Sequence, residues 1–397
     1  MRLLMLNNEF PPLGGGTGTV NRAMLERFAA VPDLEIDLIT SSLGNRQERE
    51  SFATKIEIHK VPVRNKNIHH SSNRELIEYA VRALLLAIAL HRQNPYDLCL
   101  AWSAVPAGVV ALFLKRILRL RYIVRVCGPD IPGFEQRYQM IHFFLGPLIR
   151  RVWSASERLI AKSAREIEMI HAVDPRMDCL LIPNGVDLRK FTRVQPIPDD
   201  GPIRLLCVGR LIERKGQHYL IEAVKRLTDG GIDVRLDLVG TGDARATNEA
   251  LVAKLGLTDR VRFVGYVPRE EIVREYAAAH VFVLPSYNEG MSVALLEAMA
   301  AGLALVVTPA GGTPELVQPG INGLVFEWAD VEALTGHLRR LAEDRALARR
   351  LGEASRLRAS NFSWDFAAQR YNEILVRLGE ASVASTSRLS SEAKHKI

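Results

Sequence analysis

The sequence predicts an α/β fold built from two Rossmann-like, doubly wound domains. Its 397 residues are enough for two domains of ordinary size. In each half, short apolar runs of strand length alternate with segments of helical periodicity, which is typical of parallel βαβ units. Turn-forming residues gather around 183–201, between the two series. Two such domains facing each other would leave an interdomain cleft, and ligands bind beyond the carboxyl ends of the strands.

In the first half, an apolar strand runs into a Gly-rich loop and then into a helix near 19–30. The segment 73–91 is predicted to be helical because its apolar residues recur every three or four positions. Strands are expected at 3–7, 35–40, 56–63, 97–101, 121–126 and 179–182, with helices between the later ones.

The second half repeats this plan with continuous apolar runs, which fit strands that are buried on both faces. Strands are expected at 203–208, 234–239, 261–264, 281–284 and 305–307. Helices are expected near 217–228, 248–255, 270–278, 292–300 and 331–351. The elements define an N-terminal domain over 1–185 and a C-terminal domain over 186–362. A last helix near 364–378 precedes a Ser-rich tail at 381–397, whose composition predicts disorder.

The formal net charge of +7 is unevenly distributed. Residues 1–190 carry 26 Lys and Arg against 19 Asp and Glu, whereas the remainder is balanced. The segment 115–165 alone has 11 basic and 3 acidic side chains. This asymmetry suggests an anionic partner for the first half, namely a membrane surface, a lipid-linked phosphate or nucleic acid. A solvated basic face explains it equally well, and nucleic acid is the least favoured partner because no aromatic residues accompany the charge.

Several classes of protein and site are disfavoured. The longest apolar stretches, 83–90 and 105–114, are far shorter than the roughly 20 residues of a membrane span. The N-terminus reads as a first strand without a cleavage site, so a cytoplasmic protein is expected. No D-x-D or C-x-x-C motif occurs, and free thiols and no metal site are expected. The four cysteines are Cys99, Cys127, Cys179 and Cys207.

The loop after the first strand contains Gly14, Gly15 and Gly16 and leads into a helix. Glycines at this place let backbone N–H groups approach an anion such as a phosphate, although a plain flexible turn would look the same. No Gly-Lys-Ser/Thr follows, and the dinucleotide fingerprint lacks its third glycine and its acidic residue. An NAD-dependent enzyme is therefore disfavoured.

The second half opens with a strand that ends at Gly209, and Arg210 and Lys215 flank the short loop that follows. Two cations at the carboxyl end of a strand would neutralise a diphosphate, and would stabilise the negative charge that grows on a leaving group. Exposed residues engaged in salt bridges are the simpler alternative.

A pair of acidic residues follows a later strand. Glu289 precedes the predicted helix 292–300, close to the positive end of its dipole. Glu297 lies inside the same apolar helix, where a carboxylate is costly unless it accepts hydrogen bonds, and sugar hydroxyls would supply them. An ordinary helix-terminal charge explains Glu289 better than it explains Glu297.

Taken in order, these segments resemble family 4 of the retaining glycosyltransferases, which have the two-domain GT-B fold. Each match is weak alone, but their order and spacing are specific for the family and nearly silent about the substrate. The matching segments are 14–16, 182–187, 208–210 with 215–216, 239–242, 264–267, the Glu289–Glu297 pair, and 311–315.

The resemblance implies a nucleoside diphosphate sugar, with UDP or GDP, as the donor. It implies that Arg210 and Lys215 hold the diphosphate, that Glu297 binds the ribose, and that Glu289 contacts the transferred sugar. The remaining donor contacts would come from Gly15, Gly16, Gly209, Tyr266, Val267 and the backbone at Gly290, Met291 and Ser292. It also implies retention without a metal or cofactor, and a helix at 363–380 that crosses back to the N-terminal domain.

One position departs from the family pattern. Cys127 stands where many members have a His after the strand, and a thiol cannot reproduce the imidazole. Asp130 is a candidate for contact with the acceptor, or it caps its own loop. The acceptor is expected to be a sugar or lipid-linked intermediate in polysaccharide or glycolipid synthesis, with peripheral association at the inner membrane face. Two alternatives stay open: an enzyme that hydrolyses or epimerises a nucleotide sugar, and a non-catalytic sugar-nucleotide-binding protein.

Overall fold

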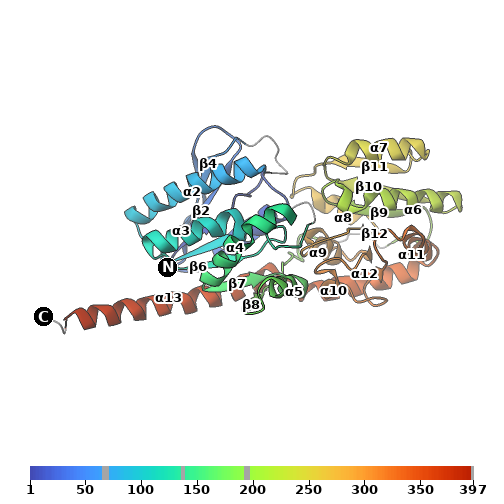
Figure 1. Ribbon diagram of the computed structural model, residues 1–397. Coiled ribbons are helices and arrows are strands. Elements are labelled where there is room, and N and C mark those ends of the chain that lie inside the picture. Colours follow the sequence, from blue (N-terminus) through green and yellow to red (C-terminus); the bar gives the residue numbers. More distant parts are fainter. Residues whose placement is uncertain (65–70, 136–138, 192–196, 395–397) are drawn as a thin grey trace. The chain divides into compact units, whose positions relative to one another are not determined.

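The computed structural model describes residues 1–64, 71–135, 139–191 and 197–394, with side chains described as far as residue 379. The chain forms two compact units (Figure 1). Unit 1 comprises Met1–Pro183 and Trp364–Ile397, and unit 2 comprises Asn184–Ser363. Residues 192–196 of the predicted linker lie outside the described ranges.

Unit 1 contains an eight-stranded sheet in the order β3-β4-β2-β1-β5-β6-β7-β8. All neighbouring strands are parallel except β3 and β4. The strand order reverses between β1 and β5, which is the topological switch point of this sheet. The strands are β1 (Arg2–Leu6), β2 (Glu35–Ser42), β3 (Glu48–Ala53), β4 (Ile56–Pro62), β5 (Leu98–Trp102), β6 (Tyr122–Arg125), β7 (Arg158–Ala161) and β8 (Cys179–Leu181).

The helices of unit 1 bury the apolar faces that their sequences predict. The capping box of Ser72 and Glu75 marks the start of α2. Tyr79, Ala83 and Ala87 lie four residues apart on one face of this helix, and they pack in the same core as residues of α3 and α4. The helices are α1 (Gly16–Phe28), α2 (Asn73–Gln93), the short η1 (Ala104–Gly108), α3 (Val109–Leu118), α4 (Gln139–Ala155), α5 (Ala164–Val173) and α13 (Trp364–Lys394).

Helix α13, drawn in red in Figure 1, joins unit 1 although it follows unit 2 in the chain. Tyr371 stacks on Trp102 of β5 and meets Phe28 of α1 edge to face, and Asp365 forms an ion pair with Arg27. The predicted return of the last helix to the N-terminal domain is thus confirmed. The backbone of α13 continues to Lys394, through most of the segment for which the composition predicted a disordered tail.

Unit 2 contains a six-stranded parallel sheet in the order β11-β10-β9-β12-β13-β14, with its switch point between β9 and β12. The strands are β9 (Ile203–Val208), β10 (Val234–Val239), β11 (Val261–Gly265), β12 (Val281–Leu284), β13 (Ala304–Val307) and β14 (Leu324–Val325). The helices are the one-turn η3 (Glu213–Lys215), α6 (Gln217–Asp229), α7 (Arg245–Lys254), α8 (Ile272–Ala278), α9 (Val293–Ala300), α10 (Thr313–Leu316), α11 (Val331–Glu343) and α12 (Arg345–Ala359).

The two Rossmann-like units confirm the predicted fold class, and the differences concern individual elements. The single helix predicted at 331–351 is wrong, because the chain breaks at Asp344. The carboxylate of Asp344 accepts the N–H of Leu347 and starts α12. Strands β3, β7 and β14 were not predicted. Strand β3 is a largely exposed, charged edge strand, and β14 has only two residues.

Candidate active site

The loops after β9 and β12 meet at the switch point of unit 2, where ligands bind in sheets of this kind. The N–H of Tyr287 donates to the carbonyl of Arg214 over 2.7 Å, and this bond ties the second loop to the first. Gly216 has φ of +66°, and a Cβ there would lie 2.1 Å from the carbonyl oxygen of Pro285. A glycine is therefore required for the loops to pack this closely.

Lys215 and Glu289 form an ion pair across these two loops. The ammonium Nζ contacts Oε1 of Glu289, and the two side chains are 13% and 9% exposed. The hydroxyl of Ser286 donates to the same oxygen over 2.8 Å. Burial raises the pKa of Glu289, but the neighbouring ammonium and hydroxyl outweigh burial and hold the pKa below its usual value. Glu289 is therefore a carboxylate at neutral pH.

Gly209 and Arg210 lie beside this ion pair on the first loop. A Cβ on Gly209 would stand 3.8 Å from Cε of Lys215, so the lysine side chain passes directly over this glycine. The amide of Gln217 donates to the carbonyl of Arg210 over 3.0 Å and fixes the backbone of the loop. Arg210 is half-buried, and it directly follows Gly209, the residue next to which the Lys215 side chain lies.

The amino end of α9 lies on the second loop. Ser292 caps the helix by accepting the N–H of Leu295 over 3.3 Å. Within the described residues, the N–H groups of Gly290, Met291 and Ser292 donate to no protein acceptor. They follow Glu289 directly, and N–H groups at the start of a helix are typical ligands of an anion.

A third loop holds this segment in place. Gly311 has φ of +55°, and a Cβ there would lie 1.6 Å from the carbonyl oxygen of Glu289. The next N–H, of Gly312, donates to the carbonyl of Gly290 over 2.6 Å. The buried amide of Asn184 donates to the carbonyl of Met291 over 3.0 Å. The glycine pair and Asn184 therefore fix the backbone around the predicted donor contacts.

Glu297 is buried inside α9, as its apolar surroundings suggested. The hydroxyl of Tyr276 on α8 lies 2.8 Å from Oε2 of Glu297. Burial raises the pKa of Glu297 to about 7, although the hydrogen bond to Tyr276 acts in the opposite direction. The second carboxyl oxygen, Oε1, has no hydrogen bond among the described residues. It remains available to a ligand hydroxyl.

Tyr266 and Val267 follow β11, at the carboxyl edge of the same sheet. Tyr266 is 58% exposed, whereas Val267 packs against the apolar cluster that contains Tyr276 and Met291. The structure thus links Val267 with the surroundings of Glu297. It leaves the Tyr266 ring largely exposed to solvent.

Gly15 and Gly16 lie in unit 1, at the start of α1. A Cβ on either one would meet no atom within 4 Å, so the protein itself does not require glycine there. Gly15 is the N-cap of α1 without a side-chain cap, and its N–H donates weakly to Oε2 of Glu9 over 3.4 Å. The amino end of α1 is open, but a carboxylate already lies against it.

Cys127 and Asp130 belong to the loop after β6, also in unit 1. The carboxylate of Asp130 accepts the N–H of Cys127 over 2.8 Å and that of Ala104 over 2.5 Å. Burial raises the pKa of Asp130 despite these bonds, and it raises the pKa of the Cys127 thiol to about 12. Asp130 therefore fastens its own loop to the segment after β5, and the thiol stays protonated.

The sequence did not single out three residues that shape this site. Ser286 supports Glu289, Tyr276 supports Glu297, and Asn184 supports the backbone at Met291. Asn184 lies in the matching segment 182–187 and Ser286 lies three residues before Glu289, so their places in the sequence gave a hint of their roles. Tyr276 gave none, because an aromatic residue in an amphipathic helix usually belongs to the core.

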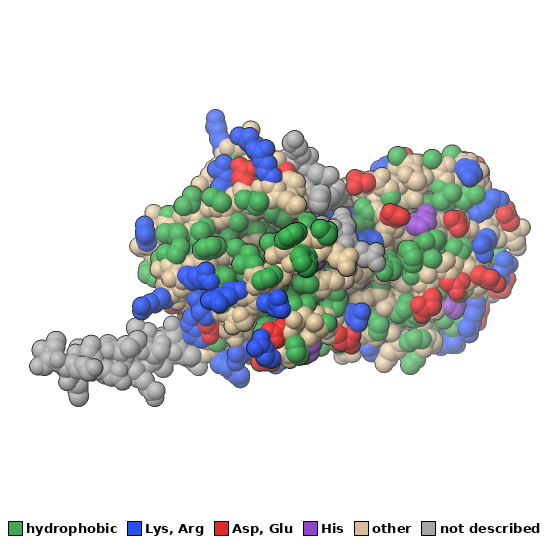
Figure 2. Space-filling model, in the orientation of Figure 1, with side chains coloured by type: hydrophobic (Ala, Val, Ile, Leu, Met, Phe, Trp, Pro, Cys, Tyr) green, Lys and Arg blue, Asp and Glu red, His purple; other side chains and the backbone are tan. Residues whose placement is uncertain are grey.

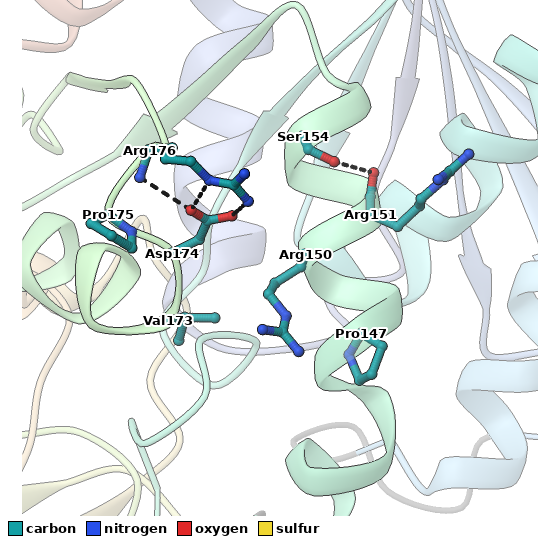
Figure 3. A pocket seen from close by; sticks show the side chains of 8 residues that line it. All are labelled: Pro147, Arg150, Arg151, Ser154, Val173, Asp174, Pro175 and Arg176. Atoms are coloured by element: carbon teal, nitrogen blue, oxygen red, sulfur yellow. Dashed lines mark hydrogen bonds and ion pairs between the residues drawn. The ribbon is translucent and has the colours of Figure 1, made fainter.

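Two further observations concern metal ligands and cavities. Within the described ranges, no three His, Cys, Asp or Glu side chains come together as metal ligands. An open hollow of about 480 Å³ lies elsewhere, between α4 and the segment after α5 (Figure 3). It precedes β7 and β8, so it lies towards the amino ends of the strands of unit 1, whereas Gly15 and Cys127 follow the carboxyl ends of β1 and β6 in the same unit.

The chain matches two family models that together cover most of its length. Residues 14–190 match "Glycosyltransferase Family 4", and residues 189–358 match "Glycosyl transferases group 1". A GDP-mannose-dependent alpha-(1-6)-phosphatidylinositol monomannoside mannosyltransferase of Mycolicibacterium smegmatis is 33% identical over 408 residues, covering 96% of this chain and 100% of that protein. A GDP-mannose-dependent mannosyltransferase of Corynebacterium glutamicum, which acts on the monoacylated form of that acceptor, is 25% identical over 94% and 97% of the two chains.

Solved structures resemble the chain over nearly its whole length. Sucrose-phosphate synthase from Thermosynechococcus elongatus has a TM-score of 0.84 at 24% identity, covering 96% of this chain and 100% of the other. The Anabaena protein HepE, in complex with UDP and glucose, has a TM-score of 0.75 at 21% identity, covering 95% and 99%. At these identities the likeness establishes the fold.

Proposed function

The chain belongs to the GT-B glycosyltransferases of family 4, and we propose that it is a retaining, metal-independent enzyme whose donor is a nucleoside diphosphate sugar. As a member of this family it is a transferase of the hexosyltransferase type. Its relatives act in glycolipid or polysaccharide assembly, which places its own reaction in the same area.

The observation that carries the proposal is the ion pair of Lys215 and Glu289 at the switch point of unit 2. A diphosphate attracts an ammonium group more strongly than one carboxylate does, because it carries more negative charge. We therefore infer that Lys215 exchanges Glu289 for the donor diphosphate. The freed carboxylate of Glu289 then accepts hydrogen bonds from hydroxyls of the transferred sugar.

Arg210 and the amino end of α9 complete the diphosphate site in this proposal. Arg210 follows the glycine that the lysine side chain passes over, and its guanidinium suits a phosphate because it donates in a bidentate manner. The N–H groups of Gly290, Met291 and Ser292 add donors whose place is fixed before the donor binds. Such preorganised groups stabilise the leaving diphosphate most as its charge grows, and so they lower the barrier.

Glu297 would bind the ribose through its open oxygen Oε1, while Tyr276 holds the other oxygen. Val267 would present its backbone to the base, with Tyr266 beside it. This arrangement distinguishes a ribonucleotide from a bare phosphate. It does not identify the base, and both GDP and UDP are candidates, since the relatives use GDP-mannose and HepE binds UDP.

The transfer itself replaces one bond at the anomeric carbon. An acceptor hydroxyl attacks from the face that the diphosphate leaves. The bond from the anomeric carbon to the acceptor oxygen forms as the bond to the diphosphate oxygen breaks, and the hydroxyl proton passes to that departing oxygen. Glu289 holds the sugar and forms no covalent intermediate in this scheme.

A direct test combines a donor panel with analysis of the product. The purified protein is screened by thermal shift with UDP, GDP and their sugars, since a ligand of the native state raises its melting temperature. The nucleotide sugar that binds is then incubated with candidate acceptors in EDTA, and the anomeric configuration of the product is read by NMR. We expect transfer with retention in EDTA. Inversion, or loss of activity that added metal restores, would refute the proposal.

The same assay separates the two alternatives. An enzyme that hydrolyses or epimerises the donor would consume it at the same rate without an acceptor. A binding protein would show the thermal shift but no turnover with any acceptor. Membership of a glycosyltransferase family favours transfer over both alternatives.

A further inference from the structure

Four aromatic side chains gather at the carboxyl edge of the sheet in unit 2. Trp328 follows β14, Tyr287 lies in the loop after β12, and His218 and Tyr219 belong to the first turn of α6. The ring centroid of Trp328 lies 4.9 Å from that of Tyr287 and 5.4 Å from that of Tyr219, and the His218 ring lies 3.9 Å from Tyr219. Three chain segments thus contribute to one group of rings, which we call the aromatic cluster.

The aromatic cluster is open to solvent. Tyr287 and Trp328 are 52% and 39% exposed. All four tryptophans of the chain lie among the described residues, and the other three, Trp102, Trp153 and Trp364, are at most 2% exposed. A tryptophan ordinarily buries most of its surface, so exposed rings grouped in this way mark a site of interaction.

The backbone on either side of these rings is fixed by the fold. The N–H of Tyr287 ties its loop to the loop after β9. On one side of Trp328, the N–H of Phe326 donates to the carboxyl end of β13 over 3.1 Å. On the other side, the carboxylate of Asp330 caps α11. The segments that carry the rings are therefore held in place before a ligand binds, which reduces the entropy lost on binding.

Carboxylates border the aromatic cluster. Glu327 is exposed and directly precedes Trp328. Glu213 and Glu222 lie close enough to His218 to favour its protonation, but burial outweighs them and lowers the pKa of His218. The imidazole is therefore neutral at neutral pH, and the charges at this border are negative.

The basic residues of the adjoining loop are engaged elsewhere. Lys215 is paired with Glu289, and Arg214 donates to the carbonyl of Asn288 over 3.0 Å. Figure 2 shows acidic side chains alongside basic ones on the visible face of unit 2, in agreement with the balanced charge of the second half of the sequence. The aromatic cluster therefore does not suit a phosphate or the anionic surface of a bilayer. No helix in the described part of the chain is long and apolar enough to span a bilayer.

The aromatic cluster continues the row of loops that the proposed donor occupies. Along the carboxyl edge of the sheet, the loop after β11 carries Val267 for the base, and the loops after β9 and β12 carry the diphosphate site. Tyr287 lies two residues before Glu289, which would contact the transferred sugar. Trp328 follows β14, at the opposite edge of the sheet from β11. A ligand at the cluster would thus lie beyond the transferred sugar, away from the base.

We propose that the aromatic cluster binds a neutral hexopyranose unit of the glycan that accepts the transferred sugar. The C–H groups on one face of a pyranose carry a slight positive charge and suit the negative face of an aromatic ring, while its hydroxyls donate to the bordering carboxylates. A cationic ligand would also suit rings and carboxylates, but the adjoining site for the transferred sugar favours a sugar. Only the assignment of the glycan as the acceptor rests on the proposed function.

The test is titration of the full-length protein, without nucleotide, with neutral hexasaccharides of glucose, mannose or galactose. Hexagalacturonic acid serves as an anionic chain of the same length, and tetramethylammonium serves as a cation. Because Trp328 alone among the four tryptophans is exposed, a bound sugar should change the tryptophan fluorescence and protect it from quenching by acrylamide. We expect at least one neutral hexasaccharide to do both, and hexagalacturonic acid to bind more weakly because the border is acidic.

Variants of one residue separate the ring from the fold. Trp328→Ala should weaken the binding measured by calorimetry by at least about tenfold, because a large aromatic contact is lost. Trp328→Phe keeps a ring and should retain most of the affinity. Matched controls are Phe113→Ala on α3 and Leu357→Ala on α12, at residues that are 42% and 77% exposed, and both should bind like the wild type. Nucleotide affinity should stay unchanged in all four variants and shows that each is folded.

Four results would overturn the inference. No neutral hexasaccharide binds, Trp328→Ala binds as well as the controls, tetramethylammonium or hexagalacturonic acid protects Trp328 better than every neutral chain, or a nucleotide sugar displaces the hexasaccharide while its nucleotide does not. The last result would assign the cluster to the donor's own sugar. Because nucleotide affinity is measured separately, each of these failures is distinguishable from a failure of the proposed function.

Discussion

Each sheet has one switch point, where the order of its parallel strands reverses. It lies between β1 and β5 in unit 1 and between β9 and β12 in unit 2. In unit 1 the carboxylate of Glu9 lies 3.4 Å from the N–H of Gly15, at the amino end of the first helix. In unit 2 the N–H groups at the amino end of α9 donate to no acceptor within the described residues. Lys215 forms an ion pair with the adjacent Glu289. The comparison shows that each sheet has one switch point, and that a cation and open N–H donors lie only at the one in unit 2 among these two segments, as the proposed diphosphate site requires.

The same contrast holds for the buried carboxylates of the two units. Both oxygens of Asp130 in unit 1 accept backbone N–H groups of the protein itself. Glu297 in unit 2 has one oxygen held by Tyr276, and the other has no partner in the described ranges. A carboxylate whose two oxygens both accept hydrogen bonds from the protein contributes to stability. A carboxylate with one oxygen left without a hydrogen bond can accept one from a ligand.

The largest effect is expected from Lys215→Met, which keeps the length of the side chain and removes its charge. The turnover number for transfer should fall by about 10²- to 10³-fold, because a preorganised charge at the leaving group is lost. The buried Glu289 also loses its partner, which should cost about 3 kcal/mol of unfolding free energy. Steady-state kinetics and denaturant titration measure the two effects, with Lys225→Met on the surface of α6 as the control.

A double variant separates stability from chemistry at this ion pair. Lys215→Met with Glu289→Gln should regain most of the lost unfolding free energy, since no buried charge is left unpaired. It should remain as inactive as the single variant. Recovered activity would mean that Lys215 serves only to neutralise Glu289.

Glu297→Gln should produce an intermediate effect that depends on pH. A carboxylate accepts ribose hydroxyls more strongly than a neutral carboxyl does. With a pKa of about 7 for Glu297, the wild-type affinity for the nucleotide sugar should therefore fall below pH 7, by at most about tenfold per pH unit. The variant should bind more weakly at pH 8 and without this slope. Calorimetry with an intact nucleotide sugar is the suitable measurement, because its diphosphate does not titrate in this range.

The same residue affects stability with a defined sign. Between its unfolded pKa of 4.5 and its folded pKa of about 7, the folded protein binds the proton of Glu297 more tightly than the unfolded chain. Its contribution to the unfolding free energy should therefore decrease as the pH rises through this window. The difference between wild type and Glu297→Gln in denaturant titrations should show this slope, and a flat difference would argue against the raised pKa.

Asp130→Asn should affect stability more than donor binding. The amide offers only one acceptor oxygen, so one of the N–H groups of Ala104 and Cys127 loses its partner, at a cost of about 1–3 kcal/mol. Affinity for the nucleotide should stay within the error of the measurement. If instead the KM for the acceptor rises while the unfolding free energy is unchanged, Asp130 contacts the acceptor and the contrast between the units is weaker.

The smallest effect is expected from Cys127→Ser. The thiol is half-buried and stays protonated below its pKa of about 12, so it contributes no charge at any pH used for assay. Turnover should change by no more than about twofold, as for a surface substitution without a specific role. A large loss would show that this position takes part in the reaction even without the usual imidazole.

Local patterns predicted much of the fold and part of the site. Buried parallel strands are continuous apolar runs, and so β9 to β12 were placed nearly to the residue. The break at Asp344 was missed because a capping side chain inside an amphipathic pattern looks like a surface residue. Strand β3 was missed because its exposed, charged residues lack the alternation of a half-buried strand.

In the site, residue identities were predictable and their pairings were not. Lys215 and Glu289 are far apart in the chain, and their contact depends on the neighbouring positions of β9 and β12 in the sheet. The partner of Glu297 is an aromatic residue from another helix, which no spacing rule connects to it. Long-range packing therefore supplied the information that local patterns lacked.

The central claim is that Arg210 and Lys215 neutralise the donor diphosphate without a metal ion. Calorimetry in EDTA tests it most directly, by comparing UDP with UMP and GDP with GMP on the wild type, Arg210→Gln and Lys215→Met. The account predicts that the wild type binds one diphosphate at least about tenfold more tightly than its monophosphate, and that each variant loses most of this preference. An unchanged preference in both variants, or one that appears only after metal is added, would contradict the account.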